Sequence, residues 1–354
     1  MTAPLPAMIL AAGRGERMRP LTAVRAKPAL PVLGVPLVAR IVKHLAGQGV
    51  SSFAVNAWHA PDSIGAACAR AGLPAGRVEL YPERELMGTG GALAAPAARL
   101  AEAPHFLLHN GDTLLAAPVA SLVDGASTAS LGALLVRKGR DTRYNPVRVA
   151  NGRFLGLGMA RDGGESEVTY LGVALLARAV LERVPQGRPS ELFRDILLPA
   201  IADGGTLAVV PYDGPWIEFT SPARYRAHCC SLALAGSAST GGLIGGEAAV
   251  TRAGTPYGAR FVLADGAGLD PGAVLDGGVV LEAGARAGRG ASITGSVLLE
   301  GAEAAAGSML WQTVVMPGTR VPSGAAFRDG VVLRDAGDPS GPVRCVPFAD
   351  LEGR

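Results

Sequence analysis

A six-residue period dominates the last third of the sequence. Aliphatic residues recur at this spacing, at Leu263, Leu269, Leu275, Leu281, Ala287, Ile293 and Leu299. Glycines follow three residues behind, at Gly266, Gly272, Gly278, Gly284 and Gly290. After a break in register around residues 308–314 the period resumes, with Val315, Val321 and Phe327 and with Gly318, Gly324 and Gly330. A fixed short period is typical of a solenoid, in which each repeat buries its apolar side chain only against neighbouring repeats.

Each repeat supplies one inward apolar side chain and a glycine where the chain must turn tightly. An Ala- and Gly-rich disordered tail is the alternative, and the shared phase of aliphatics and glycines argues against it. The pattern resembles the left-handed parallel β-helix of hexapeptide-repeat proteins, so we expect that fold here. The segment 232–246 is poor in charge and rich in Gly, Ser and Ala, which is typical of a linker. We therefore predict one domain over residues 1–235 and a linker with the β-helix over residues 236–354.

Residues 6–230 show a different pattern, in which short apolar runs alternate with segments of helical periodicity. This alternation predicts an α/β domain with a mainly parallel sheet. The expected strands are Ala7–Leu10, Ser52–Asn56, Val78–Tyr81, Phe106–His109, Ser130–Val136, Thr169–Leu175 and Leu207–Tyr212. The expected helices are Leu37–Gln48, Ala92–Leu100 and Glu191–Ala202.

Composition narrows the classes of partner. The net charge is only +3 over 354 residues, and Lys and Arg are spread along the chain, which argues against nucleic acid and anionic membrane and favours a small anionic ligand. Four cysteines form neither a disulfide framework nor a metal-binding spacing. The N-terminus has no basic segment before its short apolar run, and no later stretch reaches the length of a membrane span. We expect a cytoplasmic protein.

The most informative stretch for function is Met8–Leu37. A buried strand runs directly into Gly13-Arg14-Gly15, where backbone amides at the carboxyl edge of a sheet can cradle phosphate. Arg17 and Lys27 follow as two cations that could neutralise a triphosphate. Four prolines restrict the loop that carries them.

This stretch resembles the signature of the sugar-1-phosphate nucleotidyltransferases, LAAGxGxRMxPLTxxxxKPxxPVxGxPL, and matches it at nearly every fixed position from Leu10 to Leu37. The resemblance implies a Rossmann-like (GT-A-type) domain with a mainly parallel mixed sheet. It also implies that the loop wraps the nucleotide, that Arg17 stabilises the transition state and the leaving pyrophosphate, and that Lys27 contacts phosphate. The implied nucleotide-binding residues of this loop are Leu10, Ala11, Ala12, Gly13, Arg14 and Gly15.

Two further segments match the same family. The glycine cluster after Glu83 is similar to the segment that lines the nucleobase pocket, which implies roles for Glu85, Gly88 and Thr89. Asn110-Gly111-Asp112 ends an apolar strand and matches the family's NGD motif. A carboxylate at that edge is well placed to hold Mg²⁺ against phosphate oxygens, so Asp112 is the expected metal ligand.

A fourth segment, Trp216–Tyr225, resembles the family motif WxDxGTPxxY, whose aspartate is the second magnesium ligand. Glu218 stands in place of that aspartate, and Thr220 and Ser221 replace the glycine and threonine. Glutamate keeps the charge but adds a methylene group, and small displacements are costly in catalysis. The resemblance therefore makes Glu218 a candidate metal ligand. Whether its longer side chain reaches the metal ion is left open.

The identities of sugar and base stay open. Tyr170 and Gly172 match the segment that faces the sugar phosphate, while the family's usual Glu-Lys-Pro motif is absent. The branch with N-acetylmuramate 1-phosphate uridylyltransferases also lacks that motif, and the segment through Trp216 resembles the same branch. The attached hexapeptide domain resembles mannose-1-phosphate guanylyltransferases and longer thymidylyltransferases instead.

The expected reaction joins a nucleoside triphosphate to a sugar 1-phosphate with release of pyrophosphate and with Mg²⁺ as cofactor. A catalytically weak regulatory homologue that binds sugar nucleotide is the alternative, favoured by the altered motif at 218–221. A bifunctional enzyme with acyl transfer is a further alternative, but no histidine lies beyond His228 to serve as its base. We therefore assign the repeat domain to assembly or regulation and expect a homo-oligomer formed through it.

Overall fold

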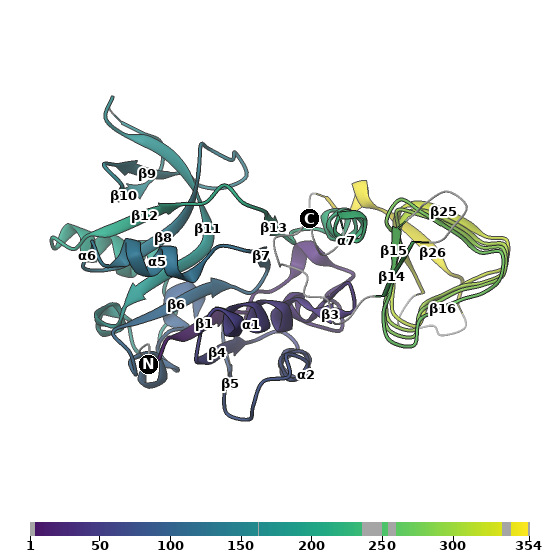
Figure 1. The fold of residues 1–354 in the computed structure, drawn as a ribbon, viewed down its shortest axis with the longest axis horizontal. Helices are drawn as coiled ribbons and strands as arrows, with labels where there is room; N and C mark the ends of the chain where they lie inside the picture. Colours follow the sequence, from purple (N-terminus) through teal and green to yellow (C-terminus); the bar gives the residue numbers. More distant parts are fainter. Residues whose placement is uncertain (1–3, 162, 236–249, 254–259, 335–340, 353–354) are drawn as a thin grey trace. The chain divides into compact units, whose positions relative to one another are not determined.

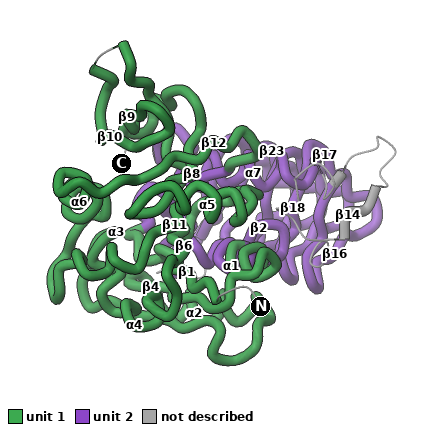
Figure 2. Tube along the Cα trace, turned by 60° about the vertical axis from the view of Figure 1, so that its left-hand side comes forward, with its two compact units in different colours: residues 1–14, 41–216 green, residues 15–40, 217–354 purple. Residues whose placement is uncertain are grey.

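The structure, a computed structural model, describes residues 4–161, 163–235, 250–253, 260–334 and 341–352 (Figure 1). The chain divides into two compact units (Figure 2). Unit 1 comprises residues 1–14 and 41–216, and unit 2 comprises residues 15–40 and 217–354. Residues 15–40 and 217–235, which the sequence groups with the first domain, thus cluster with the C-terminal strands. Most of the predicted linker lies outside the described residues, and its first four residues continue a helix.

Unit 1 is built on a nine-stranded mixed sheet. In spatial order its strands are β5 (Val78–Pro82), β4 (Ser52–Ala57), β1 (Pro6–Leu10), β6 (His105–Asn110), β11 (Ser166–Ala177), β8 (Gly132–Lys138), β12 (Leu207–Pro211), β10 (Arg153–Leu157) and β9 (Val147–Ala150). Strands β5, β4, β1 and β6 are parallel, and β11 runs antiparallel to both β6 and β8. All seven strands predicted for this region are present, with small shifts at their ends. The parallel half of the sheet brings the carboxyl ends of β1, β4 and β6 to one edge.

The helices of unit 1 are short. They are α1 (Leu37–Gly47), which begins in unit 2, α2 (Pro61–Ala69), α3 (Gly88–Gly91), α4 (Ala97–Leu100), α5 (Val119–Ala126) and α6 (Leu198–Ala202). The predicted helix over Leu37–Gln48 is confirmed as α1. The one predicted over Ala92–Leu100 is wrong, because Pro96 lacks an amide hydrogen and separates α3 from α4. The one predicted over Glu191–Ala202 begins as a wide π-helical turn over Leu192–Leu197 before α6.

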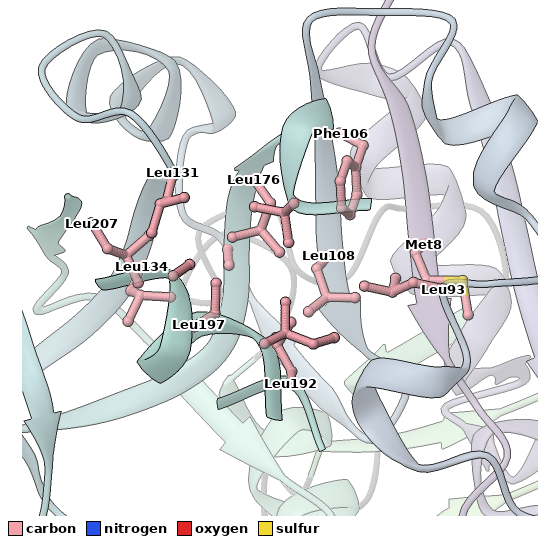
Figure 3. Packing of buried hydrophobic residues seen from close by; sticks show 14 of the residues in the cluster. Met8, Leu93, Phe106, Leu108, Leu131, Leu134, Leu176, Leu192, Leu197 and Leu207 are labelled. Carbon is pink, nitrogen blue, oxygen red and sulfur yellow. The ribbon is translucent and has the colours of Figure 1, made fainter. Parts of the chain in front are cut away.

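The core of unit 1 lies between this sheet and the helical turns that cover it. Figure 3 shows part of a cluster in which Met8 and Leu108, from neighbouring strands, lie beside Leu93, and in which Leu134 and Leu176 lie near Leu197. Every side chain in that group is almost completely buried. Burial of this kind stabilises a fold by about 1.5–3 kcal/mol for each large aliphatic side chain. The cluster therefore fixes β1 and β6, the two strands that lead into the candidate site.

Unit 2 contains a coil of short parallel strands that traces a three-sided outline in Figure 1. One face carries β15 (Arg260–Leu263), β18 (Val280–Leu281), β21 (Val297–Leu298) and the end of β23 (Met309–Val315). A second carries β16 (Gly268–Leu269), β19 (Arg286–Ala287), β22 (Glu303–Ala304) and β24 (Arg320–Val321). The third carries β17 (Val274–Asp276), β20 (Ser292–Thr294), the start of β23 and the start of β25 (Ala326–Leu333). Strands β14 (Val250–Ala253) and β26 (Arg344–Pro347) pair antiparallel at its two ends. The predicted stack of parallel repeats is thus present in unit 2.

The register of the strand coil differs from the predicted one. Leu281 pairs with Leu298 rather than with Leu299, and Leu298 pairs with Val315. The step from Ile293 to Leu298 is therefore five residues long, so the shift occurs before the predicted break at 308–314. Both Leu298 and Leu299 are buried, and for that reason periodicity alone does not distinguish them.

The predicted glycine turns are confirmed at seven positions. Residues Gly266, Gly272, Gly278, Gly284, Gly290, Gly318 and Gly324 have φ between 66° and 79°, a left-handed backbone that residues with a Cβ adopt at a cost. Gly330 differs, since it lies within β25, where a Cβ would come 2.4 Å from the carbonyl oxygen of Val346. Leu269, predicted to point inward, is 38% exposed because β16 lies at the end of its sheet.

Helix α7 (Pro222–Ala235) packs against the strand coil at Gly278. A Cβ at Gly278 would come 2.2 Å from the carbonyl oxygen of Cys230 in that helix, whereas one at Gly272 would meet only a backbone nitrogen at 3.8 Å. The two glycines have nearly the same φ, 79° and 77°. Close approach of helix and coil therefore requires glycine at position 278 but not at position 272.

This pair gives a matched test of the packing. We expect Gly272→Ala to lower the free energy of unfolding by about 1 kcal/mol, from backbone strain alone. We expect Gly278→Ala to lower it by about 3 kcal/mol, because overpacking against α7 adds to the same strain. Urea titration of both full-length variants measures the difference. Equal losses would contradict the close contact between α7 and the coil.

Candidate active site

The loop that follows β1 is held in place by a chain of hydrogen bonds. The amide of Ala11 donates to Oδ1 of the buried Asn56 (2.7 Å), at the end of β4. Nδ2 of Asn56 donates to Oε1 of Glu83 (2.7 Å), and Oε2 of Glu83 accepts from the amide of Met87 (3.0 Å). Asn56 and Glu83 thus connect the two glycine-rich segments of unit 1. Sequence reasoning missed both residues, although Asn56 follows an apolar run at the edge where ligands bind in such sheets.

Gly111 and Gly13 lie at the same edge of the sheet, but the space around an added Cβ differs between them. At Gly111 a Cβ would lie 2.7 Å from the carbonyl oxygen of Leu10, so packing of β6 against β1 accounts for it. At Gly13 a Cβ would meet nothing within 4 Å, and Gly13 and Arg14 are both exposed. Packing within the chain therefore leaves Gly13 unexplained. Close approach of a ligand to the backbone, as predicted, is one physical reason for a glycine there.

Asp112 lies at the same edge as the loop. Leu10 pairs with Asn110, and the amide of Gly111 donates to the carbonyl oxygen of Leu10 (2.9 Å), which fixes the turn that carries Asp112. The side chain of Asp112 is half-buried, and its Oδ1 accepts a hydrogen bond from the hydroxyl of Thr113 (3.1 Å). The predicted proximity of Asp112 to the nucleotide loop follows from this pairing of β1 with β6.

Strand β11 places Gly172 beside Asn110 at the end of β6, and Tyr170 opposite Val136 of β8. Its register shifts between Tyr170 and Ala174, and Gly172 in this bulge has a φ of 79°. A Cβ there would lie 2.7 Å from Nδ2 of Asn110, so Gly172 is required for the fit of β11 against that side chain. The hydroxyl of Tyr170 is buried and has no hydrogen-bond partner among the described residues. Its burial raises the pKa of Tyr170, so the phenol stays neutral and keeps a donor available.

The glycine cluster at residues 88–91 packs against the chain itself. A Cβ at Gly88 would lie 2.5 Å from the carbonyl oxygen of Ser190, and the hydroxyl of Thr89 donates to Oε2 of Glu191 (2.7 Å). The backbone of Ser190 therefore approaches Gly88 closely, and the role of this segment at a nucleobase stays a prediction. Glu85 is exposed, and the carboxylate that holds this segment is that of Glu83.

His109 is the histidine nearest to these residues, and it is only 3% exposed. Burial lowers its pKa to about 4, and its Nδ1 lies 2.7 Å from the carbonyl oxygen of Asn110. The imidazole is thus neutral at physiological pH and occupied by a structural hydrogen bond. His109 therefore packs within the sheet.

In unit 2 the candidate cations lie on a loop of two 3₁₀ turns. Gly15 has a φ of 67°, and its carbonyl oxygen accepts from the hydroxyl of Thr22 (2.7 Å). Arg17 lies in the turn Glu16–Met18, is exposed, and makes no hydrogen bond or ion pair with residues that the structure describes. Lys27 is half-buried and begins the second turn, Lys27–Ala29. Within the described residues, the guanidinium of Arg17 therefore makes no contact that stabilises the fold.

Glu218 ends strand β13 (Trp216–Glu218), is half-buried, and lies four residues before helix α7. The altered residue Ser221 still performs the helix-capping task, because its Oγ accepts from the amide of Arg224 (3.3 Å) and Pro222 opens the helix. Tyr225, the last residue of the motif, is completely buried, and its hydroxyl donates to the carbonyl oxygen of Pro31. The motif thus ties α7 to the loop that carries Lys27.

The predicted magnesium site stays a prediction, and the chemistry of its two carboxylates suits that ion. Among the residues described, no group of three or more His, Cys, Asp or Glu side chains could hold a metal ion. Mg²⁺ is commonly bound through one or two carboxylates together with water and substrate phosphates. The carboxylate oxygens of Asp112 and Glu218 are hard donors of the required kind. These residues fall in different units, and each is placed only within its own.

Comparisons with known proteins agree with these features. Residues 6–146 match the nucleotidyl transferase family. The chain is 28% identical over 296 residues to the mannose-1-phosphate guanylyltransferase of Mycobacterium tuberculosis, covering 82% of this chain and 79% of that protein. It is 29% identical over 248 residues to the N-acetylmuramate alpha-1-phosphate uridylyltransferase of Caulobacter vibrioides, covering 66% of this chain and 99% of that protein. It also matches the bifunctional protein GlmU of Rhizobium johnstonii, but spans only 49% of it.

Solved structures show a related fold. The crystal structure of HddC from Yersinia pseudotuberculosis superposes with a TM-score of 0.54 at 22% identity, covering 64% of this chain and 98% of that one. Within the described residues no helix is both long and apolar enough to cross a membrane. The family match spans the strands and loops that carry Gly13 and Asp112. The chain is therefore similar to the nucleotidyl transferase family over residues 6–146 and to relatives named as sugar-1-phosphate nucleotidyltransferases over a longer stretch.

Proposed function

We propose that this enzyme transfers guanylyl groups from GTP to mannose 1-phosphate. One observation supports this pair over the others. The similarity to the guanylyltransferase extends over 82% of the chain, whereas the similarity to the muramate uridylyltransferase ends after 66% of it and already covers that whole relative. Uridylyl transfer to N-acetylmuramate 1-phosphate is therefore the second pair to test.

The reaction needs no nucleophile from the protein. A phosphate oxygen of the sugar 1-phosphate attacks the α-phosphorus of the nucleotide and forms the new P–O bond. The bond from the α-phosphorus to the bridging oxygen breaks, and its electron pair leaves on pyrophosphate. The attacking phosphate is already anionic at neutral pH, so catalysis consists of positioning and of neutralising charge.

The residues of this chain divide those tasks. Backbone amides around Gly13 bind the nucleotide phosphates, and Arg17 and Lys27 neutralise the charge that develops on them. The backbone around Gly172 faces the sugar phosphate, next to Tyr170, whose hydroxyl is buried. Asp112 and Glu218 would hold Mg²⁺, which when bound supplies positive charge against the phosphate oxygens.

The experiment is a panel of pyrophosphate release with purified full-length protein and Mg²⁺. GTP, UTP and dTTP are each paired with mannose 1-phosphate, glucose 1-phosphate and N-acetylmuramate 1-phosphate. Fastest release with GTP and mannose 1-phosphate supports the proposal, and fastest release with another pair replaces the substrates. Nucleotide binding without release from any pair would favour a regulatory homologue.

The strand coil has a feature that supports self-association. Met309 and Trp311 on β23 are 52% and 55% exposed, and they line a hollow of about 450 Å³ together with Ser292, Thr294, Leu310, Ala326, Phe327 and Arg328. We propose that the strand coil is left-handed and that it joins copies of the chain, since exposed apolar groups of this kind mark interaction surfaces. Light scattering should give a mass above that of one chain, and Trp311→Lys should lower it. A parent protein of single-chain mass would refute this.

A further inference from the structure

The loop that carries Arg17 and Lys27 ends in a strained hairpin. Strands β2 (Pro31–Val32) and β3 (Val35–Pro36) are joined by Leu33 and Gly34, whose φ values are 53° and 82°. Two positive φ values match the two-residue turns that suit hairpins, but leucine in this conformation costs about 1–2 kcal/mol. Such a conformation persists where surrounding contacts fix it. The contacts around Leu33 therefore determine the end of the loop.

Glu282 supplies one of these contacts. It lies between β18 and β19 of the strand coil and is 1% exposed. Its Oε2 accepts a hydrogen bond from the amide of Gly34 (2.8 Å). From the other direction, Arg40 donates from Nε to the carbonyl oxygen of Val32 (2.8 Å) and from a terminal nitrogen to that of Leu33 (3.0 Å). Buried side chains outside the hairpin thus bind both its amide and its carbonyl groups.

Glu300 supplies a second contact from the next turn of the coil. Its Oε1 accepts from the guanidinium of Arg25, which stands two residues before Lys27. The hydroxyl of Tyr225 binds the carbonyl oxygen of Pro31 between these two points. The segment from Arg25 to Gly34 is therefore attached at both ends to carboxylates of the strand coil.

The coil itself has no need of a carboxylate at position 282. Leu281 pairs with Leu263 on one side and Leu298 on the other, so the residues stacked with Glu282 are Ala264 and Leu299, both apolar and buried. Burial, with the neighbouring charge of Glu300, raises the pKa of Glu282 to about 7, even though Arg40 and the amides of Leu33 and Gly34 oppose the shift. The carboxylate thus costs the fold stability, and the hairpin is what it binds.

We propose that Glu282 and Glu300 are positioning residues for catalysis, which hold the loop that carries Arg17 and Lys27. The strand coil then determines the shape of this loop, in addition to its proposed part in self-association. The expected effect on catalysis rests on the proposed function, whereas the expected effect on the order of the loop does not. Both can be measured on the full chain.

The experiment combines three variants with two measurements. Glu282→Ala removes the acceptor, Glu282→Gln keeps an acceptor oxygen without charge, and Thr313→Val is the control. Thr313 is completely buried in the same coil and donates to Oγ of Ser296 (3.2 Å). Hydrogen exchange by mass spectrometry follows residues 27–36, and steady-state kinetics gives kcat and KM for the nucleotide.

We expect Glu282→Ala to speed exchange in residues 27–36 and to lower kcat/KM about 10-fold, because small displacements of charged groups are costly. Glu282→Gln should lose about 3-fold. Thr313→Val should change neither. Unchanged exchange and kinetics in Glu282→Ala, or equal loosening in Thr313→Val, would overturn the inference. If the parent shows no activity with any substrate pair, the proposed function fails while the exchange result still decides this inference.

Thermal stability separates positioning from simple structural support. Glu282 has a raised pKa in the fold, so its contribution to the free energy of unfolding falls as the pH rises from its ordinary value of 4.5 to about 7. The groups that face it are Glu300, Arg40, Tyr225 and Cys229. At pH 8 Glu282→Gln should therefore melt no lower than the parent while its kcat/KM is reduced. A Gln variant that loses stability and activity together would point to structural support alone.

Discussion

Arg17→Ala and Asp112→Ala are each expected to lower turnover at least about 100-fold while the fold stays intact. Arg17 is exposed and has no partner among the described residues, so its removal costs the fold little. Its guanidinium would act only on the charge that develops during transfer, and removal of one such interaction costs about 10²–10³ in rate. Asp112→Ala removes a carboxylate that would hold the metal ion against the same phosphates.

Pyrophosphate release measures both losses, with circular dichroism to check the fold. Arg289→Ala is the matched control for Arg17→Ala. Arg289 is also exposed in unit 2, and each of these two variants loses one positive charge. We expect this control to keep parental turnover. Parental turnover in Arg17→Ala or in Asp112→Ala would remove that residue from the mechanism.

Glu218→Gln is expected to raise the Mg²⁺ concentration for half-maximal rate about 10-fold. A neutral amide oxygen is a weaker ligand than a carboxylate for a hard cation, whereas Glu218→Asp keeps the charge and should be tolerated. The alternative is that the longer side chain does not reach the metal. Glutamine would then behave like the parent at every Mg²⁺ concentration.

The measurement is a magnesium titration of the initial rate at saturating substrates. Glu303→Gln makes the same change on the strand coil, where Glu303 pairs with Arg320 (3.0 Å), and it should leave the titration unchanged. A parental curve for Glu218→Gln would show that Asp112 works with water and substrate phosphates alone. A shift of similar size in Glu303→Gln would attribute the effect to net charge.

Local patterns predicted the strands of unit 1 well, because each is a short apolar run closed by turn residues. The pattern around Gly88 did not indicate that the backbone of Ser190, about 100 positions away in the sequence, approaches it. Asn56 and Glu83 act through hydrogen bonds to the segments that follow β1 and β5, and only Asn56 has a local signal, as a polar residue after an apolar run. Contacts of this kind are set by tertiary packing, which a single sequence does not display.

The same limit applies to unit 2. The period of six predicted a parallel stack, but Leu298 and Leu299 are equally apolar, so the short step after Ile293 was hidden. Only one feature of the repeat indicated that the signature loop, residues 15–40, packs with it. Glu282 interrupts a run of apolar residues, and that interruption was the one local signal of the contact with Gly34.

The three-sided coil also limits how the length of this region can change during evolution. Strand partners in it are 18 positions apart at first, as for Leu269 with Ala287, and later 17, as for Ala287 with Ala304. Loss of a single hexad would turn every later strand onto the next face and carry Trp311 away from its present surface. Loss or gain of a whole coil would keep all faces in phase. Insertions and deletions among relatives should therefore come in lengths of 17 or 18 residues rather than six.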